Sequence, residues 1–147
     1  MIQITLQDLG VQDMLARLSK RTKDLSPVMR RIAGILHDAV EENFERQGRP
    51  AWVPLKPRTI RQRAKFGYWP GKILLRRGEL AASISRKFDA RSATVGTNRI
   101  YAAIHQFGGQ AGRGHKVTIP ARPFLAVTDQ DLGEIATAIQ NYLTKGV

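Results

Sequence analysis

The feature that most restricts the fold of this chain is an amphipathic segment at residues 26–45. Ser26 and Pro27 are typical of a helix start, with serine at the N-cap and proline in the first turn. Gly48 is expected to end the helix. Apolar residues recur between these signals at helical spacing, namely Val28, Ile32, Ile35, Leu36, Ala39, Val40 and Phe44. A stripe of this width must pack against a second layer, so the segment predicts the main core helix.

The segments around this helix predict strands and two further helices. Alternating residues at 2–6 indicate a half-buried strand, and Asp8 can cap a short helix after it. Leu80 begins a helical turn that leads into a strand, further strands fit 93–96 and 117–121, and 108–114 reads as a flexible glycine loop. The segment 101–107 fits a strand or a helix. Thr128 or Asp129 caps a last helix whose buried face is Leu132, Ile135, Ala136, Ile139 and Leu143.

Together these elements predict one α+β domain over residues 1–147. We expect a mainly antiparallel sheet that includes Ile4, Val95 and Ile119, packed by the long central helix and the C-terminal helix. Phe124 is expected to fill the gap between a strand and the last helix.

Residues 49–77 differ from the rest of the chain. They contain nine Lys or Arg, four prolines, four aromatic residues and no acid. The prolines exclude one long helix or a central strand, so the segment predicts an extended, irregular basic arm with a short helix at about 59–65. The residues of this arm expected to contact a partner are Trp52, Arg58, Arg61, Arg63, Lys65, Tyr68, Trp69, Arg76 and Arg77.

The whole chain carries a marked excess of positive charge. It has 24 Lys and Arg against 12 Asp and Glu, a formal net charge of +12. Such an excess indicates a partner with negative charge. Basic and aromatic groups together can bind nucleic acid through phosphate contacts and base stacking. They can equally anchor a protein interface, so the residues alone leave both functions open.

The usual catalytic and metal-binding patterns are missing. There is no cysteine, and His37, His105 and His115 form no His-x-x-x-His pair. The helix carboxylates fall on a solvent face, and no acid occurs between Ala90 and Thr128. In the glycine run 109–116, His115 stands where a phosphate loop has its lysine, and no serine lies in a Gly-x-Ser-x-Gly context. We therefore predict a protein that is not an enzyme and has no metal or cofactor.

No segment of the sequence is suited to a membrane. No apolar run approaches the roughly 20 residues that a spanning helix needs, and the first residues lack the pattern of a signal peptide. We expect no membrane partner, and a protein that stays in the cytoplasm of its host until it is assembled into something larger.

Short motifs follow one another in a recognisable order from Phe44 to the C-terminal helix. They are FERQGRPAWVPL at 44–55 with Thr59, ILLRRGEL at 73–80 with Ser83-Ile84, VGTN at 95–98, YAAIHQFG at 101–108 and IPARPFL at 119–125. This order resembles the virion morphogenesis (tail completion) proteins of Mu-like and P2-like phages and prophages. Arg77 departs from the family pattern, since the family often has a small residue directly before the glycine at position 78.

The resemblance implies a structural role. Such proteins complete the phage tail or help join it to the head, with no catalytic residues, and dock to tail or neck proteins in a ring that we expect to be a hexamer. The virion tail or neck is then the expected location. The motif residues expected to have a structural part are Gly78, Gly96, Tyr101, His105, Gln106, Phe107, Gly108, Pro120, Arg122, Pro123 and Phe124.

The same motifs imply three local features. Gly78, Gly96 and Gly108 fall where turns need a permissive backbone. The two prolines at 120 and 123 favour an extended chain that leads Phe124 and Leu125 into the core. His105 and Gln106 are expected to hydrogen-bond across this join.

Overall fold

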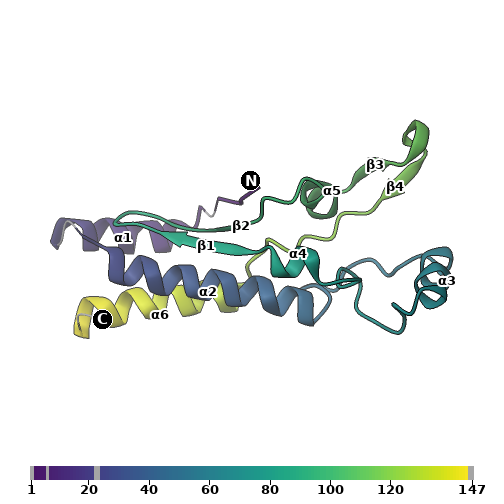
Figure 1. Ribbon diagram of the computed structural model, residues 1–147. Coiled ribbons are helices and arrows are strands. Elements are labelled where there is room, and N and C mark those ends of the chain that lie inside the picture. The colour runs from purple at the N-terminus through teal and green to yellow at the C-terminus, as the bar shows by residue number, and fades with distance from the viewer. Residues whose placement is uncertain (1, 6, 22–23, 146–147) are drawn as a thin grey trace.

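The computed structural model describes the chain except for residues 1, 6, 22–23 and 146–147. It confirms an α+β fold, drawn out along the long central helix (Figure 1). The elements in chain order are α1 (Leu9–Arg21), α2 (Ser26–Glu45), α3 (Pro57–Lys65), α4 (Glu79–Ala82), β1 (Ser85–Phe88), β2 (Ala93–Gly96), α5 (Ala102–Phe107), β3 (Gly109–Ala111), a 3-10 turn (Arg113–His115), β4 (Val117–Ile119) and α6 (Asp129–Lys145). No helix in the described ranges is long and apolar enough to cross a bilayer.

The core lies around α2, as the amphipathic pattern predicts. α6 runs beside α2, the β1–β2 hairpin covers another side of it, and α1 packs on α6 (Figure 1). The predicted apolar stripe of α2 is buried, as are Val95 of β2, Ile135 and Ile139 of α6, and Phe124 and Leu125 before α6. The two helices and one hairpin thus form a single hydrophobic core.

Local polar contacts fix the starts of the helices. The Asp8 carboxylate accepts from the Val11 amide at 2.9 Å and caps α1 as predicted. Thr128 caps α6 through two reciprocal hydrogen bonds. The Thr128 amide donates to the Asp131 carboxylate (2.8 Å), and the Asp131 amide donates to the Thr128 hydroxyl (3.3 Å). The prediction for Ser26 is wrong: it is already helical, and its amide donates to Asp24 at 2.9 Å.

The predicted single sheet is wrong in two places. The strands form two separate antiparallel hairpins, β1–β2 with Ser85 opposite Gly96 and β3–β4 with Gly109 opposite Ile119. Ile119 therefore belongs to a hairpin outside the core sheet. In the described part of residues 2–5, Ile2 makes an isolated bridge to Thr97 and no strand is formed, although Ile4 does pack on the core. Leu6, the last residue of that predicted strand, lies outside the described residues.

The segment 108–114, predicted as a flexible loop, is instead part of the second hairpin. β3 pairs with β4, and the 3-10 turn joins them. The strand predicted from the alternation at 117–121 is present but shorter, since β4 ends at Ile119. Alternation cannot show that a glycine-rich segment is its partner. Residues 101–107, which fit either type, contain the helix α5.

Candidate docking surface

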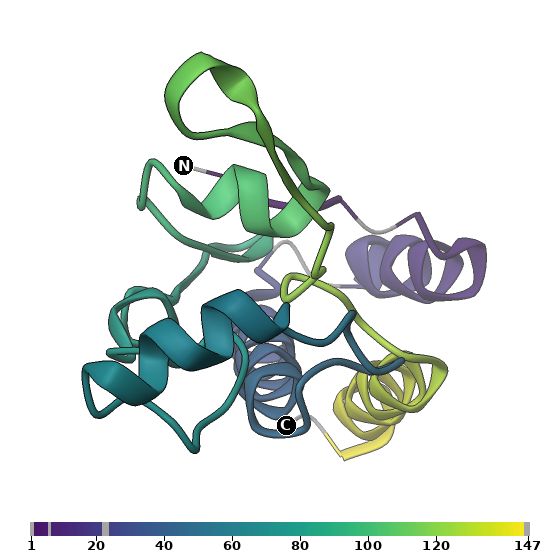
Figure 2. The same ribbon diagram turned by 90° about the vertical axis from the view of Figure 1, so that its right-hand side faces the viewer.

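Two segments far apart in the sequence lie at one end of the molecule. The loop that carries α3 and the unit formed by α5 and the β3–β4 hairpin both extend beyond the core (Figure 1), and Figure 2 views the molecule from this end. We call residues 53–77 and 97–122 the basic end, and the rest of the chain the body. The basic end contains 12 basic residues (Lys and Arg) and no acidic residue, whereas the body contains 12 basic and 12 acidic residues. The basic end therefore carries the whole net charge of +12.

The join between the basic end and the body is built around Gln106. Its side-chain amide donates to the Leu125 carbonyl at 3.0 Å, and its oxygen accepts from the amides of Phe124 (3.1 Å) and Leu125 (2.9 Å). The predicted bond across the join is therefore confirmed for Gln106. These bonds satisfy the backbone of a segment that is fully buried beside α2 and α6.

His105 takes part in the join through its backbone only. Its carbonyl accepts from the Arg122 amide at 2.7 Å, while its buried Nδ1 has no hydrogen-bond partner among the described protein groups. The bond predicted for His105 across the join is therefore confirmed for its backbone carbonyl, but not for its side chain. Burial, with a smaller effect from the Arg122 charge, lowers the pKa of His105.

Trp52 is a core residue, so its prediction as an exposed anchor of the arm is wrong. The residue is only 6% exposed, its ring stands edge-on to Phe44 with centroids 6.0 Å apart, and its Nε1 donates to the Pro123 carbonyl at 3.0 Å. Phe44 in turn packs on Phe124, with ring centroids 5.4 Å apart. The ring fills the space between α2 and the extended segment before α6, and the surface arm therefore begins at Val53.

Arg49 also belongs to the body rather than to the arm. Its side chain is 10% exposed and pairs with Asp131 at 2.9 Å and Glu42 at 3.0 Å, and its Nε donates to Asn43 at 2.7 Å. The Asn43 side-chain amide in turn donates hydrogen bonds to the Phe124 and Ala126 carbonyls. Sequence reasoning missed this network, because it took Asp131 only as a charge at a helix start and nothing local couples that residue to Arg49.

The network also sets the charge state of Asp131. Burial raises the pKa of Asp131, but hydrogen bonds from Arg49 and Thr128 and the Arg49 charge outweigh burial, so that its pKa lies below the ordinary value of 3.8. The carboxylate is therefore ionised at neutral pH and holds Arg49 against α6.

The predicted contact residues of the arm divide into two groups. Arg58, Arg61 and Lys65 are exposed on or near α3. Arg63 instead turns inward and donates to the carbonyls of Lys72 (2.9 Å) and Ile73 (2.5 Å), which closes the arm into an ordered loop. Its predicted role as a free contact residue is not supported by this geometry.

The second half of the arm is organised by Tyr68. The guanidinium of Arg76 lies 4.9 Å from the centre of its ring and that of Arg77 lies 5.7 Å away, and the Arg77 Nε donates to the Tyr68 hydroxyl at 3.2 Å. Both arginines are exposed, and Trp69 is half-buried. A cation over an aromatic face is held in place without losing its charge.

Arg122 connects the two segments of the basic end. Its Nε donates to the Val53 carbonyl at 2.8 Å and a terminal nitrogen donates to Pro54 at 3.1 Å. The motif prolines on either side keep this stretch extended, so the predicted structural part of Arg122 has a clear geometric basis.

The glycines expected at turns differ among themselves. Gly78 and Gly108 both have φ of +73°, as a turn position requires. Gly96 instead ends β2 opposite Ser85 and makes no turn.

Large apolar side chains are exposed mainly at the basic end. Ile100 is 99% exposed and Phe107 is 65% exposed. Tyr101 and Phe107, which the resemblance assigns a structural part, are thus surface residues, and Ile100 was not predicted at all. The exposed large apolar residues of the basic end are Val53, Phe66, Ile100, Tyr101, Phe107 and Val117, whereas in the described part of the body only Leu9 and Phe88 are comparable. Apolar groups among arginines are typical of a protein-docking surface.

A cavity opens where the basic end meets the body. It has a volume of about 470 Å³, and the polar and aromatic groups on its wall are Arg63, Arg76, Arg77, Glu79, Tyr101 and His105. A second cavity of about 330 Å³ lies inside the body between α1, α2 and β2 and has mostly apolar walls.

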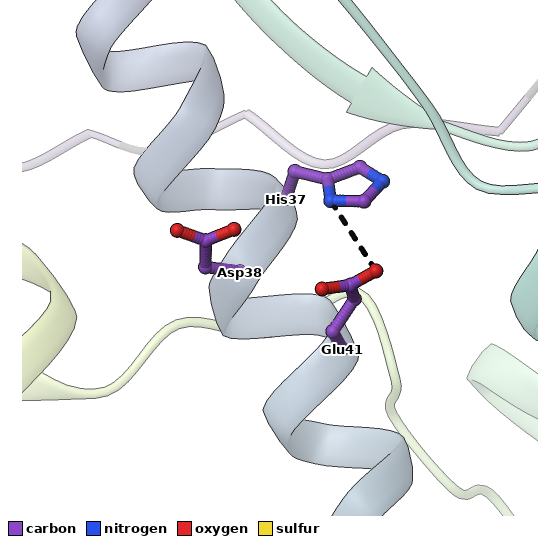
Figure 3. A group of neighbouring side chains, drawn as sticks. All are labelled: His37, Asp38 and Glu41. Atoms are coloured by element: carbon purple, nitrogen blue, oxygen red, sulfur yellow. Dashed lines mark ion pairs between the residues drawn. The ribbon is translucent and has the colours of Figure 1, made fainter.

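One cluster of possible metal ligands lies on α2. His37, Asp38 and Glu41 lie close together on the helix surface, with His37 Nδ1 3.8 Å from a Glu41 oxygen (Figure 3). Both acids are exposed, in keeping with the solvated face that the sequence predicts. Exposed acids at helical spacing need no metal, and we assign no site here.

Comparison with known proteins settles the family. Residues 6–144 match the model of the Phage virion morphogenesis family. The chain belongs to this family. The resemblance drawn from the ordered motifs is thereby confirmed, and the chain is a phage protein with a structural or assembly role.

Relatives of similar length support this assignment. The chain is 48% identical to "Mu-like prophage FluMu G protein 2" of Haemophilus influenzae, across 97% of this chain and 96% of the relative. It is 33% identical to "Putative capsid assembly protein G" of Escherichia phage Mu, across 95% and 86%. It is 29% identical to "Mu-like prophage FluMu G protein 1" of Haemophilus influenzae, across 87% and 90%. No solved structure matches the chain.

Proposed function

We propose that this protein completes the phage tail and helps to join the tail to the head. It acts without catalysis, as one subunit of a ring that docks to tail or neck proteins through its basic end. A hexamer is the expected ring, on the resemblance to neck and tail-end proteins.

The observation that carries the proposal is the division of the molecule into two ends. The whole net charge lies on the basic end, together with Phe66, Ile100 and Phe107 as exposed apolar groups. Exposed apolar surface costs free energy in water and is usually covered in the working assembly. The body has no net charge and, in its described part, only Leu9 and Phe88 as exposed large apolar residues, so the basic end is the part suited to a partner.

Binding to nucleic acid is the second candidate. Arg58, Arg61 and Lys65 on the exposed surface of the α3 arm could contact phosphates. That function explains the charge but leaves Ile100 and Phe107 without a role, since a phosphate backbone offers no apolar surface to cover them. Protein docking explains both features.

The test is complementation of a phage or prophage that lacks this gene. A chain in which a short Gly-Ser linker replaces residues 56–71 should fold but yield no infectious particles. This replacement spares Arg49 and Trp52, which a deletion of the whole predicted arm would remove from the core. Charge reversal at Arg30, Arg31 and Arg86, which are exposed on the body, is the control and should keep the particle yield.

Three outcomes are informative. Tails and filled heads that accumulate separately would support the proposal. Normal particle yield from the linker variant would overturn it. Heads without DNA beside complete tails would favour the nucleic-acid function instead.

A further inference from the structure

We propose that the cavity between the arm and α5 binds an acidic segment, rich in Asp or Glu, of the protein on which this chain docks. The inference rests on the proposed docking function and names the chemistry of the partner. Its basis is a set of arginines around one cavity that have no carboxylate partner among the residues that the structure describes.

The charges around the cavity are unbalanced. In the described ranges no carboxylate forms an ion pair with the wall residues Arg63, Arg76 and Arg77 or with Arg122, although Arg46 and Arg49 of the body and Lys72 of the basic end do form such pairs. Burial and the neighbouring Arg76 charge lower the pKa of Arg63, and burial and the Arg63 charge lower the pKa of Arg122. Arginines that repel one another in a partly desolvated place are stabilised by an arriving anion.

Two of these arginines remain available for a ligand. Arg63 and Arg122 are bound to backbone carbonyls, but Arg76 has no described hydrogen bond and Arg77 uses only its Nε, for the Tyr68 hydroxyl. The ring of Tyr68 positions both guanidinium groups. A guanidinium presents paired N–H donors that match a carboxylate, so the two side chains are suited to neighbouring acidic residues.

The remaining wall favours a polypeptide over DNA. Glu79 lines the cavity beside the arginines. A peptide can satisfy this carboxylate with its backbone N–H groups, whereas a phosphodiester backbone has only acceptors and is repelled. Tyr101 on the wall adds apolar contact area. The volume of about 470 Å³ lies within the roughly 300–1,000 Å³ of typical ligand pockets.

The test measures binding of a fluorescent six-residue peptide of alternating Glu and Asp to the purified full chain. The Arg76→Ala/Arg77→Ala variant should weaken binding about tenfold or more, since both guanidinium partners are lost. Arg58→Ala/Arg61→Ala is the matched control: it removes the same charge from the same arm outside the cavity, and should weaken binding by less than about threefold. The same peptide with Gln and Asn should not bind. In NMR spectra, the acidic peptide should raise the pKa of His105, which lies on the cavity wall.

The outcomes separate this inference from the proposed function. Equal weakening by the two double variants would show only general charge attraction and overturn the cavity site. Absence of peptide binding would do the same, as would a 20-base-pair DNA duplex that binds through Arg76 and Arg77 while the peptide does not. The docking function itself would still stand if the linker variant failed to form particles in the complementation test.

Discussion

At the scale of single residues, Arg49 shows how the body is tied together. One guanidinium connects the end of α2 to the first turn of α6, through Glu42 and Asp131. A buried pair of this kind adds little net stability over an apolar packing, but loss of one partner leaves the other charged and buried. Asp131 therefore serves to hold α6 in place against the end of α2, and not to bind a partner protein.

The first prediction concerns the pH dependence of this pair. The folded-state pKa of Asp131 lies below its ordinary value of 3.8, so its contribution to stability is present above that pH and is lost as pH falls through the lower folded value. At pH 7, Asp131→Asn should lower the free energy of unfolding by about 3–5 kcal/mol, because Arg49 is left buried without its partner. Urea denaturation at pH 7 and near pH 2 should show the difference from wild type shrinking at the lower pH. A difference that is the same at both pH values would contradict the described ion pair.

A second prediction compares the two tryptophans of the predicted arm. Trp52→Ala should cost about 3–5 kcal/mol of unfolding free energy, because a buried ring and its bond to Pro123 are lost. Phe124→Ala should cost a similar amount, since Phe124 is fully buried. Trp69→Ala should cost much less, because Trp69 is half-buried outside the core. Chemical denaturation followed by circular dichroism measures all three, and equal losses for the two tryptophans would refute this division.

At the scale of elements, two glycines with the same φ differ in what surrounds them. Gly78 and Gly108 share a φ of +73°, but only at Gly108 would an added Cβ meet backbone, 2.8 Å from the Ala121 nitrogen. Gly108 also has a ψ of 176°, a conformation that is essentially restricted to glycine. Gly108 thus sets how closely the β3–β4 hairpin approaches the extended segment that leads to the core.

The third prediction uses this pair of glycines. Gly108→Ala should displace the hairpin and remove the protection of its amides from hydrogen exchange, while the helices of the body stay protected. Gly78→Ala, with no atom within 4 Å of its new Cβ, should cost only about 1 kcal/mol and leave the hairpin protected. Hydrogen exchange measured by NMR distinguishes the two variants. Retained protection of β3 in Gly108→Ala would show that the hairpin does not need this close approach.

The elements differ in how well the sequence predicts them. The stripe of α2, the capping of α6 by Thr128 and strand β2 follow from local patterns, because period, cap and alternation are all read within a few residues. The separation into two hairpins depends on pairings that local patterns do not encode. The prolines and the charge predict the arm. They do not predict that Trp52 and Arg49 belong to the core, because the burial of these residues depends on Pro123 and Asp131, some 70 to 80 positions later. The charge and aromatic content of the docking surface could be predicted, and its exposed apolar groups at Ile100 and Phe107 could not.

At the scale of the whole molecule, charge and apolar surface share one end. Copies of this chain therefore attract one another through apolar groups and repel one another through arginines at the same place. The balance between these effects depends on ionic strength, because salt screens exposed charges beyond roughly 10 Å at about 0.1 M.

The fourth prediction follows from this balance. In isolation the chain should be monomeric at low salt and should associate as salt is raised from about 0.05 M to about 0.5 M. Analytical ultracentrifugation measures the change in mass. Phe107→Ser should reduce association at high salt, and Leu9→Ser, at an exposed position on the body, should not. Association that is strongest at low salt would contradict this account.

The placement of all net charge on one end also has a consequence for the order of assembly. In the proposed closed ring every subunit points the same way, so all the basic ends lie together on one rim and repel one another. We infer that an acidic docking surface neutralises this rim as it fills, and that ring closure is therefore favoured on the docking surface over ring closure in free solution.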